Sequence, residues 1–234
     1  MHRLFEKYRK TVLAIATHRS FLQNRIMSTV YLSTAYFAPV SYYASFLRYD
    51  RIVIEQWCNY TKQTYRNRCH IAGANGLLAL SVPIVKPDTI KCPTKDIRIS
   101  DHGEWRHLHW NAIASAYGSS PFFEYYQDDI RPFFEKRYEF LLDFNEEIRR
   151  TVCDLIGLEP HIEYSSSYSE PAPGETDLRD AIHPKKRKAE TILPVQPKPY
   201  YQVFSEKYGF QPDLSIIDLL MNMGPESILI LQNA

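Results

Sequence analysis

Residues 31–68, YLSTAYFAPVSYYASFLRYDRIVIEQWCNYTKQTYRNR, carry the pattern that decides the fold. The apolar run Val30–Thr34 is followed by a turn at Pro39, then by aromatic residues at helical spacing, and then by a second β-leaning run, Arg51–Glu55. A strand, a helix of about ten residues and another strand are typical of a βαβ unit with two parallel strands. The sequence therefore predicts an α/β fold: a single domain with a mostly parallel, Rossmann-like sheet opened by this βαβ unit, and a C-terminal helical segment.

A candidate site follows the two predicted strands. In open α/β sheets, ligands bind at the carboxyl ends of parallel strands. Aromatic side chains, one carboxylate and a basic segment come directly after these strands, and we expect a ligand site here; the alternative is a tyrosine-rich edge of the core. An arginine pair favours a phosphate-bearing ligand, because guanidinium gives bidentate, charge-assisted bonds. The predicted catalytic acid or base is Glu55, and the predicted ligand-binding residues are Tyr36, Pro39, Tyr42, Trp57, Arg66, Asn67 and Arg68.

The composition bounds the class of protein. A chain of 234 residues that is 44% hydrophobic and 24% charged can bury the core of one domain. The net charge of +1 gives no electrostatic reason to expect a nucleic-acid partner. The four cysteines form no CxxC pair, so neither a zinc site nor a disulfide framework is predicted, and a cytoplasmic location is expected. No apolar run approaches the roughly 20 residues that span a bilayer.

Two segments are predicted to stand apart from the regular core. Residues 1–26 can form a short amphipathic helix, but we interpret them as a non-core N-terminal extension and Met27 as the start of the native chain. The domain itself then covers residues 27–234. Within it, residues 169–199 are rich in proline and lysine, which is typical of a loop or connector.

The middle of the chain combines a hairpin with a helix. Asn-Gly within Gly73–Gly76 lies between two apolar runs and predicts a β-hairpin, and Ile97–Ser100 predicts another short strand. Trp105–Tyr117 has the apolar spacing of a helix. His107 and His109 are two residues apart, whereas a helical zinc pair needs a spacing of four, so no metal site is predicted.

A second helical pattern covers Tyr125–Gly157 and is broken early by Pro132. Its apolar stripe predicts a helix that covers the sheet and has no direct role in the site. His161–Ser165 predicts a returning strand. The charged side of the helix is predicted to face solvent and consists of Glu146, Glu147, Arg149 and Arg150.

The C-terminal segment specifies a short helix. Asp213 or Ser215 can cap the helix, Asp218 follows three residues after Ser215 as in a capping box, and Gly224-Pro225 supplies the stop. Asp218 and Asn222 lie on this helix, where polar core residues can hold it in place.

Several phrases of the sequence resemble the WbqC-like protein family. The opening residues Tyr36-Phe37-Ala38-Pro39, Glu55 and Arg66-Asn67-Arg68 match the start of the family pattern, although Thr34-Ala35 replaces its usual Gln-Pro. The helix from Trp105, with His109, and the phrase Leu214–Glu226 match its later motifs. The first match makes His109 a candidate acid or base. The second places Asn222 among the candidate ligand-binding residues, so Asp218 and Asn222 have two open interpretations: they serve the ligand site, or they are polar core residues.

This resemblance implies a role in surface-polysaccharide (O-antigen) biosynthesis. It suggests a small-group transferase that passes a glycyl, aminoacyl or acyl group to a nucleotide- or lipid-linked sugar. The partner would then be a small, phosphate-bearing substrate. The alternative is a ligand-binding or scaffolding protein of a polysaccharide-synthesis complex that catalyses no reaction. The sequence identifies neither a cofactor nor an oligomeric state.

Overall fold

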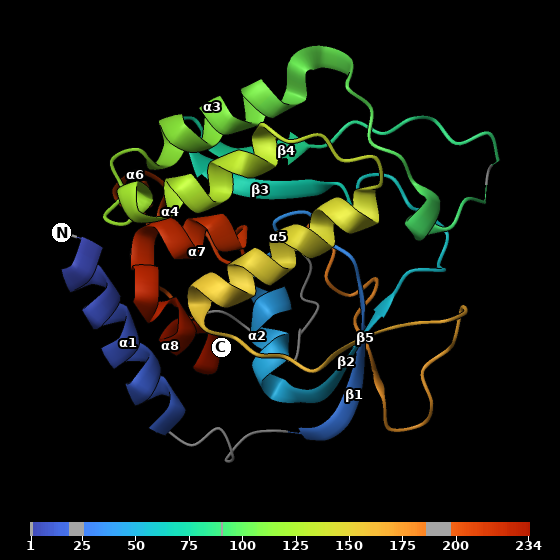
Figure 1. Ribbon diagram of the computed structural model, residues 1–234, viewed down its shortest axis with the longest axis horizontal. Coiled ribbons are helices and arrows are strands. Elements are labelled where there is room, and N and C mark those ends of the chain that lie inside the picture. Colours follow the sequence, from blue (N-terminus) through green and yellow to red (C-terminus); the bar gives the residue numbers. More distant parts are fainter. Residues whose placement is uncertain (1, 19–25, 90, 186–197) are drawn as a thin grey trace.

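The computed structural model describes residues 2–18, 26–89, 91–185 and 198–234 (Figure 1). Its strands are β1 (Ile26–Ser33), β2 (Tyr49–Glu55), β3 (Arg68–Gly73), β4 (Gly76–Ser81), β5 (Ile162–Tyr164) and β6 (Thr176–Asp177). Its α-helices are α1 (His2–His18), α2 (Val40–Arg48), α3 (Trp105–Tyr117), α4 (Phe123–Ile130), α5 (Leu141–Ile156), α6 (Ser205–Tyr208), α7 (Ile216–Met223) and α8 (Ser227–Gln232). Short 3₁₀ turns are η1 (Thr94–Asp96), η2 (His102–Glu104), η3 (Arg131–Phe134) and η5 (Gly224–Glu226).

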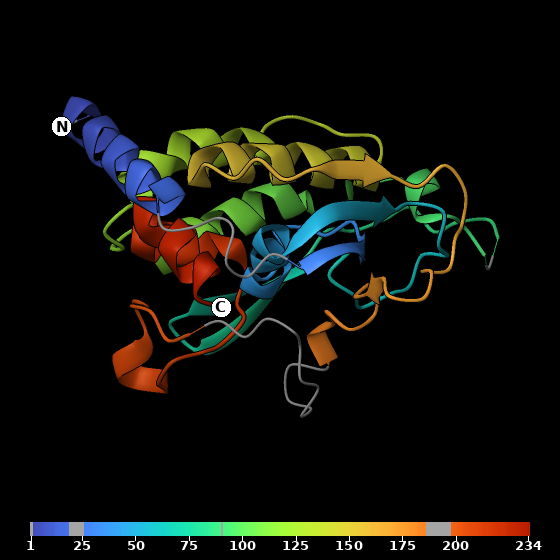
Figure 2. The same ribbon diagram turned by 90° about the horizontal axis from the view of Figure 1, so that it is seen from below.

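The central sheet confirms the predicted α/β fold. Its four strands lie in the order β5-β2-β1-β6, and all three neighbouring pairs are parallel. The pair β1–β2, joined through α2, is the predicted βαβ unit and aligns Ser33 with Glu55 at its carboxyl end. Helices α3, α4 and α5 gather on one side of this sheet (Figure 2).

The predicted hairpin is also present, as a separate two-stranded sheet. Strands β3 and β4 pair antiparallel, and the turn brings Gly73 opposite Gly76. Gly76 has a φ of 103°, which suits glycine in this turn. The predicted strand at Ile97–Ser100 forms only isolated bridges, in which Ile99 pairs with Ile84 and Arg98 with Phe140.

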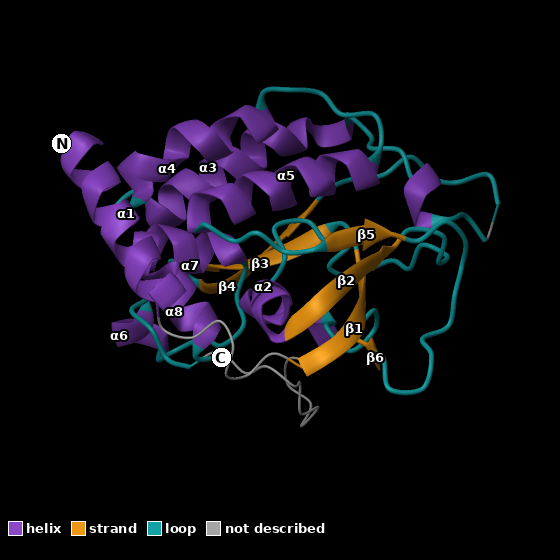
Figure 3. Ribbon diagram, turned by 60° about the horizontal axis from the view of Figure 1, so that its bottom comes forward, coloured by secondary structure: helices purple, strands orange, loops and turns teal. Residues whose placement is uncertain are grey.

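Helix α1 packs beside the C-terminal helices (Figure 3). The Phe5 ring stacks on the Tyr125 ring with centroids 4.2 Å apart, and Val12 is also buried. The Arg9 guanidinium donates to the backbone oxygen of Asp154. These contacts show that the helix contributes side chains to the core cluster, whereas the start of the native chain at Met27 stays a prediction.

Helix α5 differs from its sequence prediction in two respects. The helical segment predicted from Tyr125 is split into α4, the turn η3 with Pro132 in its first positions, and α5. The predicted solvated face is wrong for two of its four residues, because Glu146 and Arg149 are only 5% and 6% exposed. Both side chains face other elements of the fold. Neighbouring elements therefore bury a wider part of the α5 surface than its apolar stripe indicates.

Helix α7 has half of the predicted capping box. The Ser215 hydroxyl accepts a hydrogen bond from the backbone N–H of Ile217, as an N-cap should. The second half is wrong, since the backbone N–H of Ser215 donates instead to the carbonyl of His70. The Asp218 carboxylate is turned into the core, where Tyr117, Tyr200 and Gln202 donate to it.

No helix within the described part of the chain is long and apolar enough to cross a bilayer.

Candidate functional site

The carboxyl edge of the parallel sheet gathers buried charged side chains from distant parts of the sequence. Glu55 at the end of β2 is fully buried, and Arg66 and Arg179 are 4% and 8% exposed. The segments that follow β2 and β5 lie at the end of the molecule to which the strand arrows point (Figure 2). Burying charged groups is unfavourable unless they are paired and hydrogen-bonded. Such a concentration at the edge where α/β proteins bind ligands marks this edge as the candidate site.

Glu55 is held by donors from three segments. One carboxylate oxygen accepts from the backbone N–H of Trp57 at 2.6 Å and from the Ser165 hydroxyl at 2.9 Å. The other oxygen lies 3.4 Å from the Ser169 nitrogen and 3.9 Å from a nitrogen of Arg179. The carboxylate therefore fastens the segments that follow β2 and β5 to each other.

Arg179 follows β6 and is saturated with partners. Its guanidinium donates to both carboxylate oxygens of Asp177, at 2.9 and 2.6 Å, and to the Ser169 carbonyl. It also lies 3.4 Å from a carboxylate oxygen of Glu170. The pKa of Arg179 is raised, first because its guanidinium donates hydrogen bonds to the Asp177 carboxylate. Sequence reasoning missed this residue, because the composition of residues 169–199 indicated only a loop.

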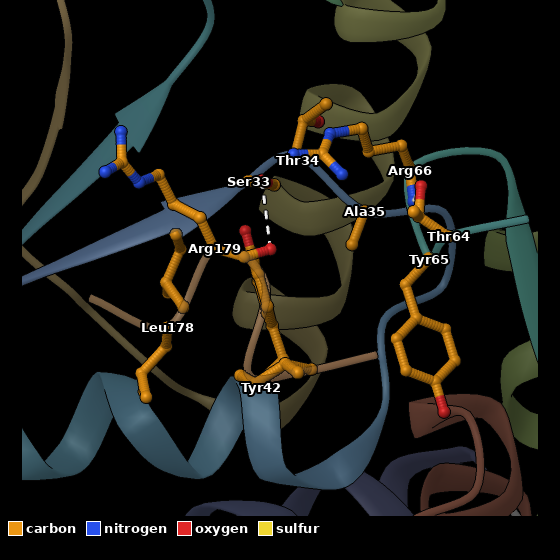
Figure 4. Close-up of a pocket in the computed structure, with 11 residues that line it drawn as sticks. Ser33, Thr34, Ala35, Tyr42, Thr64, Tyr65, Arg66, Leu178 and Arg179 are labelled. Atoms are coloured by element: carbon orange, nitrogen blue, oxygen red, sulfur yellow. Dashed lines mark hydrogen bonds between the residues drawn. The ribbon is translucent and has the colours of Figure 1, made fainter. Parts of the chain in front are cut away.

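Arg66 has fewer partners and lines a narrow pocket at the end of β1. The pocket walls come from β1 and the residues after it, from Thr64–Arg66 and from the segment after β6 (Figure 4). In this view the Arg179 guanidinium points away from Arg66. The free volume of the pocket is only about 10 Å³, which is room for about one water molecule. Of the ten predicted site residues, the structure brings two together here, Tyr42 and Arg66.

The Arg66 guanidinium is incompletely compensated. Its Nε is buried and has no hydrogen-bond partner. A terminal nitrogen lies 3.5 Å from the Cys58 sulfur and 3.8 Å from a carboxylate oxygen of Asp180, whose side chain is 79% exposed. The backbone of Arg66 is held by α5, because the Asn145 side chain donates to the Arg66 carbonyl at 2.8 Å.

A buried ion pair on α5 supports the same edge. Arg149 donates to Glu146 at 2.7 Å, and the Tyr164 hydroxyl at the end of β5 donates to the same carboxylate oxygen at 2.8 Å. The other oxygen accepts from Thr34 at the end of β1. Glu146 therefore joins α5 to two strands. Sequence reasoning had placed this pair in solvent.

The remaining predicted residues near this edge lie around the pocket rather than in it. Trp57 is 37% exposed, its indole N–H donates to the Ser165 carbonyl, and Lys95 lies 4.4 Å above its ring. The Asn67 amide donates to the Val82 carbonyl. Arg68 donates to the Ser81 hydroxyl across the hairpin, and Pro39 forms a backbone bridge with Ser215.

His109 lies elsewhere, between α3 and the aromatic core. Its Nδ1 is 2.9 Å from the Tyr36 hydroxyl, and its ring contacts those of Trp105 and Phe134. Burial lowers the pKa of His109 to about 4, opposed by a hydrogen bond to the backbone of Ser81. The imidazole is therefore neutral at neutral pH. No hydrogen bond or ion pair between described residues joins His109 to Glu55, so the two predicted catalytic residues occupy different places.

The neutral His109 predicts a pH-dependent stability. Below its ordinary pKa of 6.5 the unfolded chain binds a proton that the folded protein accepts only near pH 4. The unfolding free energy should therefore fall as the pH is lowered from 6.5 to 4, by about 3 kcal/mol from this group alone. Urea titrations of the wild type and His109→Asn across this range would measure it. Equal pH slopes for the two proteins would contradict the prediction.

Asn222 and Asp218 are tied into the core. The Asn222 amide donates to the Asp218 carbonyl within α7, while its side-chain oxygen is buried without a partner. The Asp218 carboxylate holds Tyr117 of α3 at 2.9 Å, and Tyr200 and Gln202 at 2.7 and 2.8 Å. For Asp218 these contacts favour the polar-core interpretation. The ligand-binding role of Asn222 stays a prediction.

In the described ranges, no three His, Cys, Asp or Glu side chains are placed to hold a metal ion together.

Comparison with known proteins decides the family. The model of the WbqC-like protein family matches residues 34–230, which is most of the chain. The chain belongs to the WbqC-like protein family. A relative is an uncharacterised protein of Mycobacterium tuberculosis, 25% identical over 214 residues that cover 82% of this chain and 89% of the relative. No solved structure matches the chain.

The WbqC-like match includes the whole candidate edge. It begins at Thr34, directly at the carboxyl end of β1, and extends into α8. Helix α1 and the whole of β1 precede it. Glu55, Arg66, Glu146 and Arg179 all lie within the matched region.

Proposed function

We propose that this WbqC-like protein is a small-group transferase in surface-polysaccharide (O-antigen) biosynthesis. It transfers a glycyl, aminoacyl or acyl group to a nucleotide- or lipid-linked sugar. The observation that carries the proposal is the incompletely compensated Arg66 at the carboxyl edge of the sheet. The resemblance described above, rather than the geometry, supplies the class of reaction.

Arg66 supports a phosphate-bearing substrate on physical grounds. A buried cation is unfavourable unless an anion and hydrogen-bond acceptors lie close to it. The carboxylate that pairs with Arg66, that of Asp180, is 3.8 Å away and largely exposed, and the Arg66 Nε has no acceptor. A phosphate oxygen supplies both the negative charge and the missing acceptor. Because the pocket holds only a water-sized group, Arg66 would contact one edge of such a ligand.

The proposed reaction needs a base beside the acceptor. The acceptor nitrogen or oxygen attacks the carbonyl carbon of the donor, the bond to the donor's leaving group breaks, and the base takes the acceptor proton. Glu55 is the first candidate base, because its carboxylate lies 3.9 Å from a nitrogen of Arg179, a residue that lines the same pocket as Arg66. His109 stays a second candidate base. Because its pKa is low, one ring nitrogen is unprotonated at neutral pH and can accept a proton.

The proposal predicts that Arg66→Ala lowers kcat/KM for product formation about a hundredfold. The reason is the loss of charge-assisted hydrogen bonds to the phosphate, which contribute about 1.5–3 kcal/mol each. The assay incubates purified protein with acyl-coenzyme A and aminoacyl donors and with nucleotide-linked amino sugars, and detects product by mass spectrometry.

Two variants control this experiment. Arg131→Ala removes an exposed arginine from η3, where it pairs only with Glu135, and should retain full activity. Arg66→Lys keeps the charge and should recover part of the activity. Circular dichroism would check that each variant is folded. Binding of a sugar ligand without any product would favour the non-catalytic scaffold instead.

A further inference from the structure

A larger cavity lies next to the candidate edge and has no role assigned so far. Its volume is about 590 Å³, within the range of about 300–1,000 Å³ that small-molecule sites occupy. Two chain segments form its walls, the one after β2 and the one after β4. The residues that matter for its chemistry are Tyr60, Lys62, Ile84, Lys86, Asp88 and Cys92.

The walls of this cavity are fixed by backbone hydrogen bonds. The N–H of Tyr60 donates to the Cys92 carbonyl at 2.9 Å, and the N–H of Thr94 donates to the Cys58 carbonyl at 2.9 Å. At the other end of the loop, Val85 donates to the Arg98 carbonyl. The two segments therefore hold each other, and the cavity is largely formed before any ligand binds.

The cavity is basic. Lys62 and Lys86 both line it and are exposed, and neither forms an ion pair with any described residue. Asp88 is the one acidic residue among the described side chains that line it. Unpaired lysines around a concave surface raise the local concentration of anions and bind phosphate as point charges.

Tyr60 connects this cavity with the arginines of the edge. Burial raises the pKa of Tyr60 to about 12, although the charges of Arg66 and Arg68 lower it. These two guanidinium groups are therefore near the phenol, and the phenol stays protonated and can donate a hydrogen bond. Tyr60 thus lies near Arg66 and Arg68 and lines the same cavity as Lys62 and Lys86.

We propose that this cavity binds the diphosphate of the substrate, with Lys62 and Lys86 at its rim and Tyr60 at its inner wall. The inference rests on the proposed function, because it names the substrate class as a diphosphate-linked sugar. Size supports the assignment, because the pocket beside Arg66 has a volume of only about 10 Å³ and is too small for a diphosphate. The cavity, at about 590 Å³, is large enough. The diphosphate occupies the cavity and directs one phosphate toward Arg66. The same chemistry is found in a nucleoside diphosphate and in a prenyl diphosphate.

Isothermal titration calorimetry at low ionic strength tests the proposal with the full-length protein. The probes are UDP, geranyl diphosphate and pyrophosphate, and uridine and geraniol are the matched compounds without phosphate. The test variant is Lys62→Gln/Lys86→Gln. The control variant, Lys7→Gln/Lys10→Gln, removes two exposed lysines from α1, at the opposite end of the molecule (Figure 1).

We expect the wild type to bind at least one diphosphate and neither uridine nor geraniol. The test variant should bind that probe at least about tenfold more weakly, because two charge-assisted contacts are lost. The control variant should bind it like the wild type. Preference for UDP over geranyl diphosphate, or the reverse, identifies the source of the diphosphate.

Three results would overturn the inference. They are no diphosphate binding by the wild type, equal binding of uridine and UDP, and unchanged affinity in the test variant. These outcomes are distinct from failure of the proposed function. If Arg66→Ala abolishes diphosphate binding and Lys62→Gln/Lys86→Gln does not, the assignment of the diphosphate to this cavity is wrong. The transferase proposal then still stands. If binding of the diphosphate depends on the lysines but no pair of donor and acceptor gives product, the transferase proposal fails. The assignment of the cavity as a diphosphate site then still stands.

Discussion

Asp218→Ala should destabilise the folded protein by about 4 kcal/mol. The wild-type carboxylate is fully buried and accepts from Tyr117, Tyr200 and Gln202. Removing it leaves these donors without an acceptor in a site closed to solvent, and each unsatisfied buried donor costs about 1–3 kcal/mol. The full sum is not expected, because the Gln202 amide also donates to the Gln211 carbonyl.

Urea denaturation followed by circular dichroism would measure this loss. Asp218→Asn is the matched control, because it keeps the shape and one acceptor oxygen and should lose less stability than Asp218→Ala. Asn222→Ala is a second control, because it removes a neighbouring polar side chain of α7 that makes one hydrogen bond within the helix. A loss below 1 kcal/mol for Asp218→Ala would show that the carboxylate does not organise this part of the core.

Glu146→Ala should destabilise the protein by about 4 kcal/mol as well, for an electrostatic reason. Removal of Glu146 leaves the guanidinium of Arg149 buried without its 2.7 Å partner. Breaking a buried ion pair at one partner typically costs about 3–5 kcal/mol, whereas replacing both by apolar residues is often nearly neutral. Thr34 and Tyr164 also lose their acceptor.

Thermal and urea unfolding of three variants separates these effects. Glu146→Ala should be strongly destabilised, and Glu146→Leu/Arg149→Met should regain most of the loss. Glu147→Ala is the matched control, since the Glu147 side chain is 44% exposed and pairs with Lys136 at the surface, and the change in stability should be much smaller than for Glu146→Ala. Equal losses for Glu146→Ala and the double variant would contradict a charge effect.

The sequence predicted those parts of the fold that local signals determine. The β1–α2–β2 unit, the hairpin at Gly73–Gly76 and α3 followed from periodicity and turn residues. Gly157 ends α5 with a φ of 78°, as a glycine at this position should. Each of these signals lies within one continuous stretch, the longest being residues 26–55, so residues close in the sequence are enough to reveal it.

The missed features depend on contacts between distant residues. Glu146 contacts Thr34 across 112 positions, and Ser165 contacts Glu55 across 110. The amphipathic pattern of α5 indicated one buried face and could not show that a second face is covered. Arg179 lay in a segment whose composition matched a loop. Of the candidate site, the position at the carboxyl edge and the residues Glu55, Tyr42 and Arg66 followed from the sequence, while the buried partners around them did not.

The two outer strands of the sheet have an unusual origin. Strands β5 and β6 pair on opposite sides of the β1–β2 unit, yet both come from residues 162–177. One continuous stretch thus borders the sheet on both sides and also supplies Ser165, Ser169 and Asp177 to the candidate edge. Under the proposed function, substitutions confined to this stretch would alter the substrates that the edge admits, because most of the hydrophobic core comes from other segments.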